Sequence, residues 1–381
     1  MKKYFLVLGG SIHLKSTVLK IYKEYDILLV DYNDNPPLKK YSKLFIKCNL
    51  RNKEQCLSKV SKFNIIAIIS DHNDFAINTY GYLCSKLKLP GINFKVTNQF
   101  TDKHLCKKKL SKISSVKRNI PNFILANNFN HNHFKSKKII LKPTNMQGSR
   151  HVVKLLNHKH AKKDIMNFIK NKREKFIIEE CIEGEIFAIE TIVFDNKINF
   201  LTLSKKKKFS NSFIDKEVNF YKNTNSPKLK SLKKLNKKII QNLELKNGIT
   251  HGEYIFSKKD KKFYLIEIAC RGGGSGITDV IIPYLTSFSP PNFLIDLALN
   301  RQKKLRKIVY SRKYCSLNWL EPNYYSLKKQ KPDFILFKSD NKKFNLNKKK
   351  ILIQNSEDRG PYFIIADLKQ KNLTKKKKFI Y

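Results

Sequence analysis

The stretch that most constrains this chain is residues 250–276, THGEYIFSKKDKKFYLIEIACRGGGSG. Its apolar alternation predicts two strands joined by the polar turn 258–262. If that hairpin is centred on Asp260, Glu253 and Glu267 lie directly opposite each other, and like charges in that position destabilise a strand pair. A divalent cation between the two carboxylates would reverse this effect, because Mg²⁺ takes hard oxygen ligands.

Alternation along the second strand further predicts that Phe263, Leu265 and Glu267 share one face. Directly after this strand come Arg271 and the glycines 272–274, which let the backbone approach a ligand closely. The simpler alternative is an amphipathic hairpin whose glutamates face water, since a one-residue slip in register destroys the pairing.

The net charge of +48 suggests a nucleic-acid partner at first sight. However, only nine of the 78 basic residues are arginine, and the lysines are spread beside many Asn and Ile residues, as in an AT-rich genome. Proteins that read nucleic acid favour arginine for its bidentate fork, and the sequence has no zinc-ligand spacing or RNP-type motif. We therefore expect no specific nucleic acid, although non-specific attraction to polyanions is a consequence of the charge.

Composition also limits the compartment and the size of the fold. The sequence has seven cysteines without a CxxC pair, no signal-peptide pattern and no apolar run of 18 residues. These features predict a cytoplasmic protein with free thiols and no membrane span. A chain of 381 residues with 41% hydrophobic residues can bury the cores of two or three domains.

Residues 1–100 alternate strand and helix patterns, which predicts a parallel sheet with helices on both faces. The expected strands are 4–8, 27–30, 44–48 and 65–69, and the expected helices are 53–62 and 74–87.

Residues 101–170 contain two lysines that are candidate functional residues. Lys103 follows Thr101 and Asp102 at the start of a helix, and a strand over 138–141 delivers Lys142. The loop 144–150 that follows is small, polar and rich in donors. Such a loop can wrap phosphates with its backbone N–H groups, but its pattern is also that of a common hairpin loop.

Residues 171–300 place four glutamates within seven positions, between strands expected at 176–178 and 187–194. These are Glu179, Glu180, Glu183 and Glu185. A solvated loop is the simpler interpretation. The lysine run 205–208 also reads as solvated, and His251 as an ordinary strand residue, although Lys205 and His251 are candidates to touch a substrate. Helices are expected at 229–245 and 292–299, and residues 301–381 contain strand-like pieces at 307–310, 333–337, 351–354 and 360–367.

Taken in order, these pieces resemble an ATP-grasp ligase of the carbamoyl-phosphate-synthase-like and amino-acid-ligase-like branch. The similarity rests on TDK, IILKPTNMQGSRHV, FIIEECIEGEIFAIE, THGEYIF, FYLIEIACRGGG and SEDRGPYFIIAD, and it covers nearly the whole length. It implies a mixed α/β and α+β class with the ATP-grasp fold. The implied parts are a Rossmann-like domain (1–100), a small lid subdomain (101–170), a large subdomain (171–300) and a C-terminal β-rich segment (301–381).

The resemblance also implies how ATP is bound. Lys103 and Lys142 would hold the phosphates, and the loop 144–150, with Gly148 and Ser149, would close over them. Glu179 would meet the adenine amino group.

The backbone from Glu180 to Ile182 would complete the adenine hinge. Glu253 and Glu267 would hold Mg²⁺ or Mn²⁺. Arg271, and with it Lys142, would act in catalysis, with Arg271 steadying the carboxylate that is phosphorylated.

Three departures from the family pattern affect these roles. Ile186 stands where a ribose-binding Glu is common, so that Glu185 or Glu183 must substitute or the contact is lost. Ala269 replaces the Asn of the usual Glu-x-Asn-x-Arg, which leaves two glutamates, phosphate oxygens and water for the metal. The loop carries Met146-Gln147 where smaller residues are usual.

The function expected from the resemblance is an ADP-forming ligase that joins a small-molecule carboxylate to an amine through an acyl phosphate. Homodimerisation is common among such enzymes. One alternative is a carboxylase or carbamoyl-phosphate-type enzyme that uses bicarbonate, although a full synthase would need a second ATP-grasp half. A non-catalytic nucleotide- or polyanion-binding protein is the other, and it would predict loss of Glu253 and Glu267, which are both present.

Overall fold

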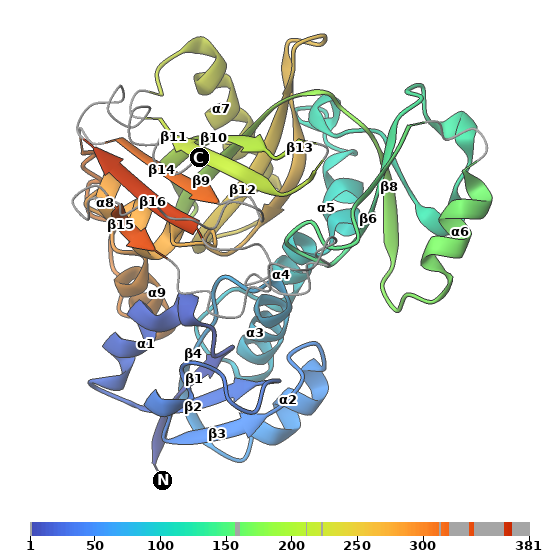
Figure 1. The fold of residues 1–381 in the computed structure, drawn as a ribbon. Helices are drawn as coiled ribbons and strands as arrows, with labels where there is room; N and C mark the ends of the chain where they lie inside the picture. The colour runs from blue at the N-terminus through green and yellow to red at the C-terminus, as the bar shows by residue number, and fades with distance from the viewer. Residues whose placement is uncertain are drawn as a thin grey trace, which may run out of the picture.

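The structure is a computed structural model, and it describes residues 2–156, 161–210, 212–221, 224–311, 314–319, 335–338 and 362–367. Its strands form three sheets, of four, eight and four strands. The N-terminal sheet lies at one end of the molecule, and the other two lie in a central body and in a unit beside it (Figure 1).

The N-terminal sheet has the strand order β3-β2-β1-β4, and every pair in it is parallel. Its strands are β1 (Lys3–Leu8), β2 (Asp26–Asp31), β3 (Leu44–Lys47) and β4 (Asn64–Ile69). The helices are α1 (Lys15–Tyr22), α2 (Lys53–Val60) and α3 (Asp74–Leu87). Alternate residues of β1 enter two separate cores, one on each face, which explains why its apolar run is continuous. The parallel sheet predicted for residues 1–100 is confirmed.

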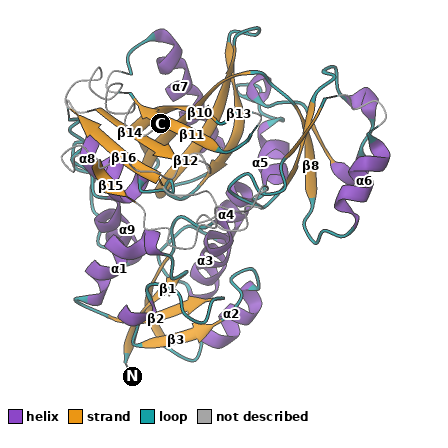
Figure 2. Cartoon of the chain, in the orientation of Figure 1, coloured by secondary structure: helices purple, strands orange, loops and turns teal. Residues whose placement is uncertain are grey.

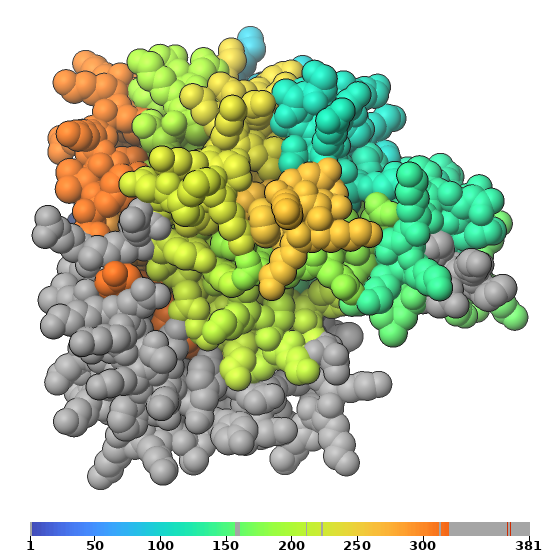
Figure 3. All heavy atoms as spheres, turned by 90° about the horizontal axis from the view of Figure 1, so that it is seen from above, coloured from blue at the N-terminus to red at the C-terminus, as the bar shows by residue number. Residues whose placement is uncertain are grey.

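The second four-stranded sheet is antiparallel and has the order β5-β8-β6-β7. It contains β5 (Phe123–Leu125), β6 (Ile139–Pro143), β7 (Val153–Leu155) and β8 (Phe176–Glu180). Helix α6 (Lys162–Lys170) packs on it through Ile165. Seen from above, this unit projects from the body as a lobe coloured teal to green (Figure 3). Because β8 pairs with β5 and β6, the sheet extends past the limit of 170 that the sequence suggested.

The eight-stranded sheet forms the body, with the order β13-β12-β9-β10-β11-β14-β16-β15 (Figure 2). Its strands are β9 (Gly184–Phe194), β10 (Lys197–Lys208), β11 (Asp215–Phe220), β12 (Gly248–Ser257), β13 (Lys262–Ala269), β14 (Tyr314–Trp319), β15 (Ile335–Lys338) and β16 (Tyr362–Asp367). The expected piece at 307–310 is not a strand, because only Tyr310 forms a single bridge, to Thr286. The expected strand at 351–354 lies outside the described residues.

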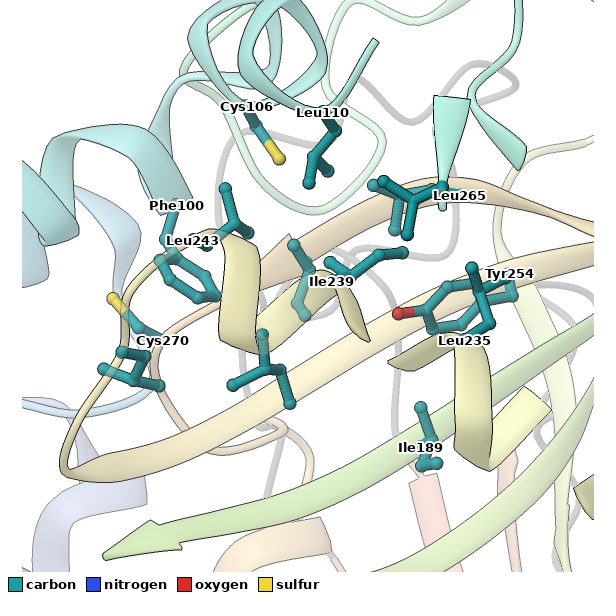
Figure 4. Packing of buried hydrophobic residues seen from close by; sticks show 14 of the residues in the cluster. Phe100, Cys106, Leu110, Ile189, Leu235, Ile239, Leu243, Tyr254, Leu265 and Cys270 are labelled. Atoms are coloured by element: carbon teal, nitrogen blue, oxygen red, sulfur yellow. The ribbon is translucent and has the colours of Figure 1, made fainter. Parts of the chain in front are cut away.

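Helices cover both faces of this sheet. On one face, α4 (Phe94–Thr101), α5 (Lys103–Leu110) and α7 (Pro227–Asn242) pack on the strands through the large core that includes Phe100, Leu110, Ile239 and Leu265 (Figure 4). On the other face lie a π-helix (Ile277–Ile281), α8 (Ile282–Leu285) and α9 (Pro290–Ala298). Short 3₁₀ helices span Ile12–Leu14, Lys39–Tyr41, Lys117–Asn119, Ala126–Asn128 and His131–His133.

None of the helices in the described part of the chain combines the length and the apolar character that crossing a membrane needs.

Candidate active site

Strands β12 and β13 place Glu253 directly opposite Glu267, as the sequence predicted. The turn is one residue shorter than expected, because Ser257 pairs with Lys262. A bulge at Ile266 then shifts the register between Glu253 and the next residue, so that the two glutamates meet. The pairing was therefore correct, although the turn that was used to derive it was not.

The same bulge reverses the faces of β13. Tyr254 pairs with Leu265 and Glu253 pairs with Glu267, and neighbouring residues of β12 point to opposite faces. Leu265 and Phe263 accordingly enter the core, whereas Glu267 lines a cavity on the other side. The prediction that Phe263, Leu265 and Glu267 share one face is wrong.

Both glutamates are neutralised by neighbouring cations. Glu267 lies 3.2 Å from the Nζ atom of Lys103, and Glu253 contacts Lys206 and the Nε2 atom of His251. Burial would raise the pKa of Glu253, but Lys206 and His251 outweigh it and hold the pKa well below its ordinary value.

The donor set suits a hard divalent cation. Two facing carboxylates supply oxygen ligands of the kind that Mg²⁺ takes. No group of three or more His, Cys, Asp or Glu side chains that could hold a metal occurs among the described residues. The remaining ligands would therefore have to come from a bound phosphate and from water, as the Ala269 substitution already indicated.

Lys103 connects helix α5 to the loop 144–150. Asp102 caps the helix by accepting from the N–H groups of His104 and Leu105, which fixes the position of Lys103. The backbone N–H of Lys103 then donates to Thr144, and its Nζ atom lies 2.6 Å from the carbonyl oxygen of Met146. The side chain thus touches both the loop and a metal-candidate glutamate.

Glu179 and Lys142 belong to a buried ionic triad whose third member, Lys107, the sequence did not reveal. One carboxylate oxygen of Glu179 lies 2.9 Å from the Nζ atom of Lys142 and 3.1 Å from that of Lys107. Burial would raise the pKa of Glu179, but the two lysines outweigh it and lower the pKa. Burial lowers the pKa of Lys107 to about 8 despite the neighbouring carboxylate.

The second oxygen of Glu179, Oε1, is buried and has no hydrogen-bond partner among the residues that the structure describes. A buried acceptor without a donor is costly, and such atoms in folded proteins call for an explanation. An amino group such as that of adenine would satisfy it, so that the observed geometry fits the role that the resemblance implied.

Residues 180–185, from the end of β8 to the start of β9, are more exposed than that triad. Glu180 accepts a hydrogen bond from the backbone of Ser136 at 3.2 Å, and Ile182 lies in the connection to β9. Glu185 contacts Lys205 and Lys228, which together lower its pKa to about 2. Glu179, Glu183 and Glu185 are therefore paired with lysines, and the cluster is more than a solvated loop.

The loop 144–150 joins β6 to β7 as a hairpin loop. Gly148 and Ser149 both have positive φ angles, of 75° and 58°. The side chain of Ser149 donates to the carbonyl oxygen of Phe213, and Gln147 accepts from the backbone of Asp74. The loop consequently contacts both the large sheet and the N-terminal domain.

Arg271 lies at the end of β13 and contacts Asp74, which is at the start of α3. The N–H of Gly272 donates to Asp71 over 2.7 Å. Burial would lower the pKa of Arg271, but Asp74 raises it further above its usual value. These bonds hold the Arg271 guanidinium between two domains. There it lines the same cavity as the two glutamates.

Several of these residues line a cavity of about 920 Å³. Its walls include Glu253, Glu267 and Arg271, together with residues 147–150 of the loop and residues 9–14 of the N-terminal domain. Glu179 and Lys142 lie outside its lining.

Lys206 and Lys208 also line this cavity, and Lys206 is buried between Asp215 and Glu253. The interpretation of 205–208 as a solvated run is wrong. The run lies in β10, where alternation sends Lys206 and Lys208 to one face and Lys205 to the other.

His251 pairs with Ala269 across the hairpin and contacts Glu190 through Nδ1. Burial would lower the pKa of His251, but Glu190 outweighs it and raises the pKa to about 9. Far from being an ordinary strand residue, His251 is a buried cation 3.1 Å from Glu253. Its spacing two residues before that glutamate was the available signal in the sequence.

Comparisons with known proteins agree with this geometry. A family model described as an ATP-grasp domain matches residues 135–279. The L-amino acid ligase from Bacillus licheniformis superposes with a TM-score of 0.74 at 14% identity, covering 100% of this chain and 97% of that one. Phosphoribosylglycinamide synthetase from Anaerococcus prevotii gives 0.72 at 19% identity, with 99% and 97% covered.

A third structure is the biotin carboxylase domain dimer of 2-oxoglutarate carboxylase from Hydrogenobacter thermophilus, in complex with MgADP, ADP and bicarbonate. It gives a TM-score of 0.64 at 16% identity and covers 84% of this chain and 74% of that one. A search of the curated proteins found no match. At these identities the likeness shows the shared fold.

Proposed function

We propose that this chain, a member of the ATP-grasp superfamily, is an ADP-forming ligase that joins a carboxylate to an amine through an acyl phosphate. The observation that carries the proposal is the facing pair Glu253 and Glu267, with Arg271 at the end of the same strand. A hairpin that only needed stability would not place two carboxylates opposite each other.

Each nucleotide-binding residue has a role that its surroundings support. The unpartnered oxygen of Glu179 accepts the adenine amino group, and the backbone from Glu180 to Ile182 completes the hinge. Lys103 and Lys142 act as point charges for the phosphates. Glu185 takes the role of the ribose-binding glutamate, because Ile186 occupies the position where that glutamate is common.

Glu253 and Glu267 would hold Mg²⁺, and the bound ion would supply positive charge to the phosphate oxygens. Lys103 and Lys206 balance these two carboxylates in the structure, so that metal binding requires the lysines to move toward other anions. A bound triphosphate supplies such anions.

The reaction needs no side-chain nucleophile. A carboxylate oxygen of the substrate attacks the terminal phosphorus, the bond from that phosphorus to the ADP oxygen breaks, and Arg271 stabilises the carboxylate charge. The amine nitrogen then bonds to the activated carbonyl carbon, and the C–O bond to phosphate breaks. Phosphate leaves with the electron pair, and the nitrogen gives up a proton to the departing phosphate. The loop 144–150 excludes water from the acyl phosphate.

The test is ADP release with Mg²⁺ and pools of amino acids and sugar acids, in the wild type and in Glu267→Gln. We expect substrate-dependent release that falls by about 100-fold in the variant. Glu54→Gln, an exposed change on α2, serves as the matched control and should leave release unchanged. Release that depends on bicarbonate alone would favour the carboxylase-type alternative, and the absence of nucleotide binding would overturn the proposal.

A further inference from the structure

The cavity differs from the rest of the chain in the kind of cation that lines it. Only nine of the 78 basic residues in the sequence are arginine. Among the described residues, however, the cavity is lined by as many arginines as lysines, namely Arg51, Arg150, Arg173 and Arg271 beside Lys47, Lys59, Lys206 and Lys208. In a chain where lysine is the default cation, arginine concentrated at one place indicates a need for its planar fork.

Arg271 belongs to the site already described, but the other three arginines do not. Arg51 follows β3 of the N-terminal domain, Arg150 ends the loop after β6, and Arg173 precedes β8. Three separate segments from two units of the fold thus bring arginine to the lining of the cavity.

Arg51 is in contact with the segment that carries Arg173. The Nη1 atom of Arg51 lies 3.0 Å from Glu174, the neighbour of Arg173, and its guanidinium lies 3.8 Å from the centroid of the Phe75 ring. Stacking on an aromatic face holds a guanidinium in a fixed plane. The fork of Arg51 is therefore oriented before any ligand arrives.

Charges from the segments of Arg150 and Arg173 both act on His151. Burial lowers the pKa of His151, and Lys172 and Arg150 lower it further, against the opposing effect of Glu174. Asp31, which also lines the cavity, is engaged by the backbone N–H groups of Gly10 and Asn33.

We propose that Arg51, Arg150 and Arg173 form a subsite for an oxyanion carried by the second substrate of this ligase, apart from the carboxylate that is activated. The inference rests on the proposed function, because it places one substrate in the cavity beside Arg271. The oxyanion is a phosphate ester or a further carboxylate, since the guanidinium fork matches both. The subsite is separate from the adenine end, where Glu179 and Lys142 lie outside the cavity lining.

The chain carries its own reporter for this test. Its only tryptophan, Trp319, lines the cavity, so that its fluorescence can follow binding there. The full chain is first saturated with ADP and Mg²⁺, which fills the nucleotide site. Inorganic phosphate and succinate are then titrated separately as the two probes.

The matched variants are Arg51→Lys, Arg150→Lys and Arg173→Lys, which keep the charge and remove the fork. Arg118→Lys, on an exposed 3₁₀ helix, is the control. We expect at least one probe to bind the ADP-loaded chain, with a Kd about tenfold higher in the cavity variants and unchanged in the control. The tighter probe identifies whether the oxyanion is a phosphate or a carboxylate.

Two results would overturn the subsite while leaving the ligase intact. One is normal ADP binding with neither probe binding, and the other is probe binding that the three cavity variants do not weaken. Failure of ADP itself to bind would instead refute the proposed function, and the subsite with it.

Discussion

Glu179 and Glu185 are each held by two lysines, and the difference between them is burial. Glu179 lies between Lys107 and Lys142 inside the protein, whereas Glu185 lies between Lys205 and Lys228 near the surface. The buried side chain is 5% exposed and the other is 26% exposed. The same charge pattern can therefore be a structural and binding element in one place and a weak surface network in the other.

The largest effect is expected from removing the central carboxylates. Glu179→Ala leaves two buried lysines without a counter-charge, which costs about 3–5 kcal/mol of the free energy of unfolding. Glu185→Ala removes a partly exposed pair of contacts and costs about 1 kcal/mol or less. Urea denaturation of both variants measures the difference, and equal costs would show that burial does not separate the two triads.

Substitution of the two glutamates should change nucleotide affinity differently, because each glutamate contacts a different part of the proposed nucleotide. Glu179→Gln keeps the shape of the side chain but removes a charged acceptor, so that the Kd for ADP should rise about tenfold. Glu185→Gln should weaken ADP less, by about threefold, because its contact is exposed to solvent. Calorimetric titration measures both.

The deoxynucleotide provides the control for Glu185. If this residue contacts the ribose, its substitution should have no further effect on the affinity for 2′-deoxy-ADP. A loss of equal size with both nucleotides would place Glu185 away from the sugar.

The two triads should change the free energy of unfolding in different pH ranges. The pKa of Lys107 is about 8 when folded and ordinarily 10.5, so that the unfolded chain binds more protons between these values and stability rises with pH there. The pKa of Glu185 is about 2 when folded and ordinarily 4.5, so that its small contribution is present above pH 4.5 and is lost as pH falls toward 2.

Lys107→Met provides the check on the alkaline window. It leaves a single buried pair, Lys142 with Glu179, and replaces a buried cation with an apolar side chain of similar length. We expect a change within about 1.5 kcal/mol at pH 7 and loss of the alkaline rise. A rise of unchanged size in the variant would assign it to another group.

The sequence predicted elements with a strong period more reliably than it predicted where charges are buried. The parallel sheet of residues 1–100 followed from alternation. The pairing of Glu253 with Glu267 was predicted correctly because the shorter turn and the bulge offset each other. The bulge at Ile266 could not be foreseen, because an inserted isoleucine looks like any strand residue. That single residue places Glu267 on the face opposite to Phe263 and Leu265.

The missed site residues lie in lysine runs. Lys107 belongs to a run in α5 and Lys206 to a run in β10, and each run contains one lysine that tertiary packing buries against carboxylates distant in sequence. In a chain with a net charge of +48, composition conceals such positions. Period-two alternation within 205–208 was the one local signal that pointed to Lys206.

The central claim is that the substrate carboxylate becomes an acyl phosphate, and oxygen transfer tests it most directly. The carboxylate identified by the ADP-release screen is labelled with ¹⁸O, and the phosphate released in the complete reaction is analysed by mass spectrometry. The account predicts one ¹⁸O atom in each phosphate, because the C–O bond to phosphate breaks when the amine attacks. Phosphate without label, with ADP formed at the same rate, would contradict it.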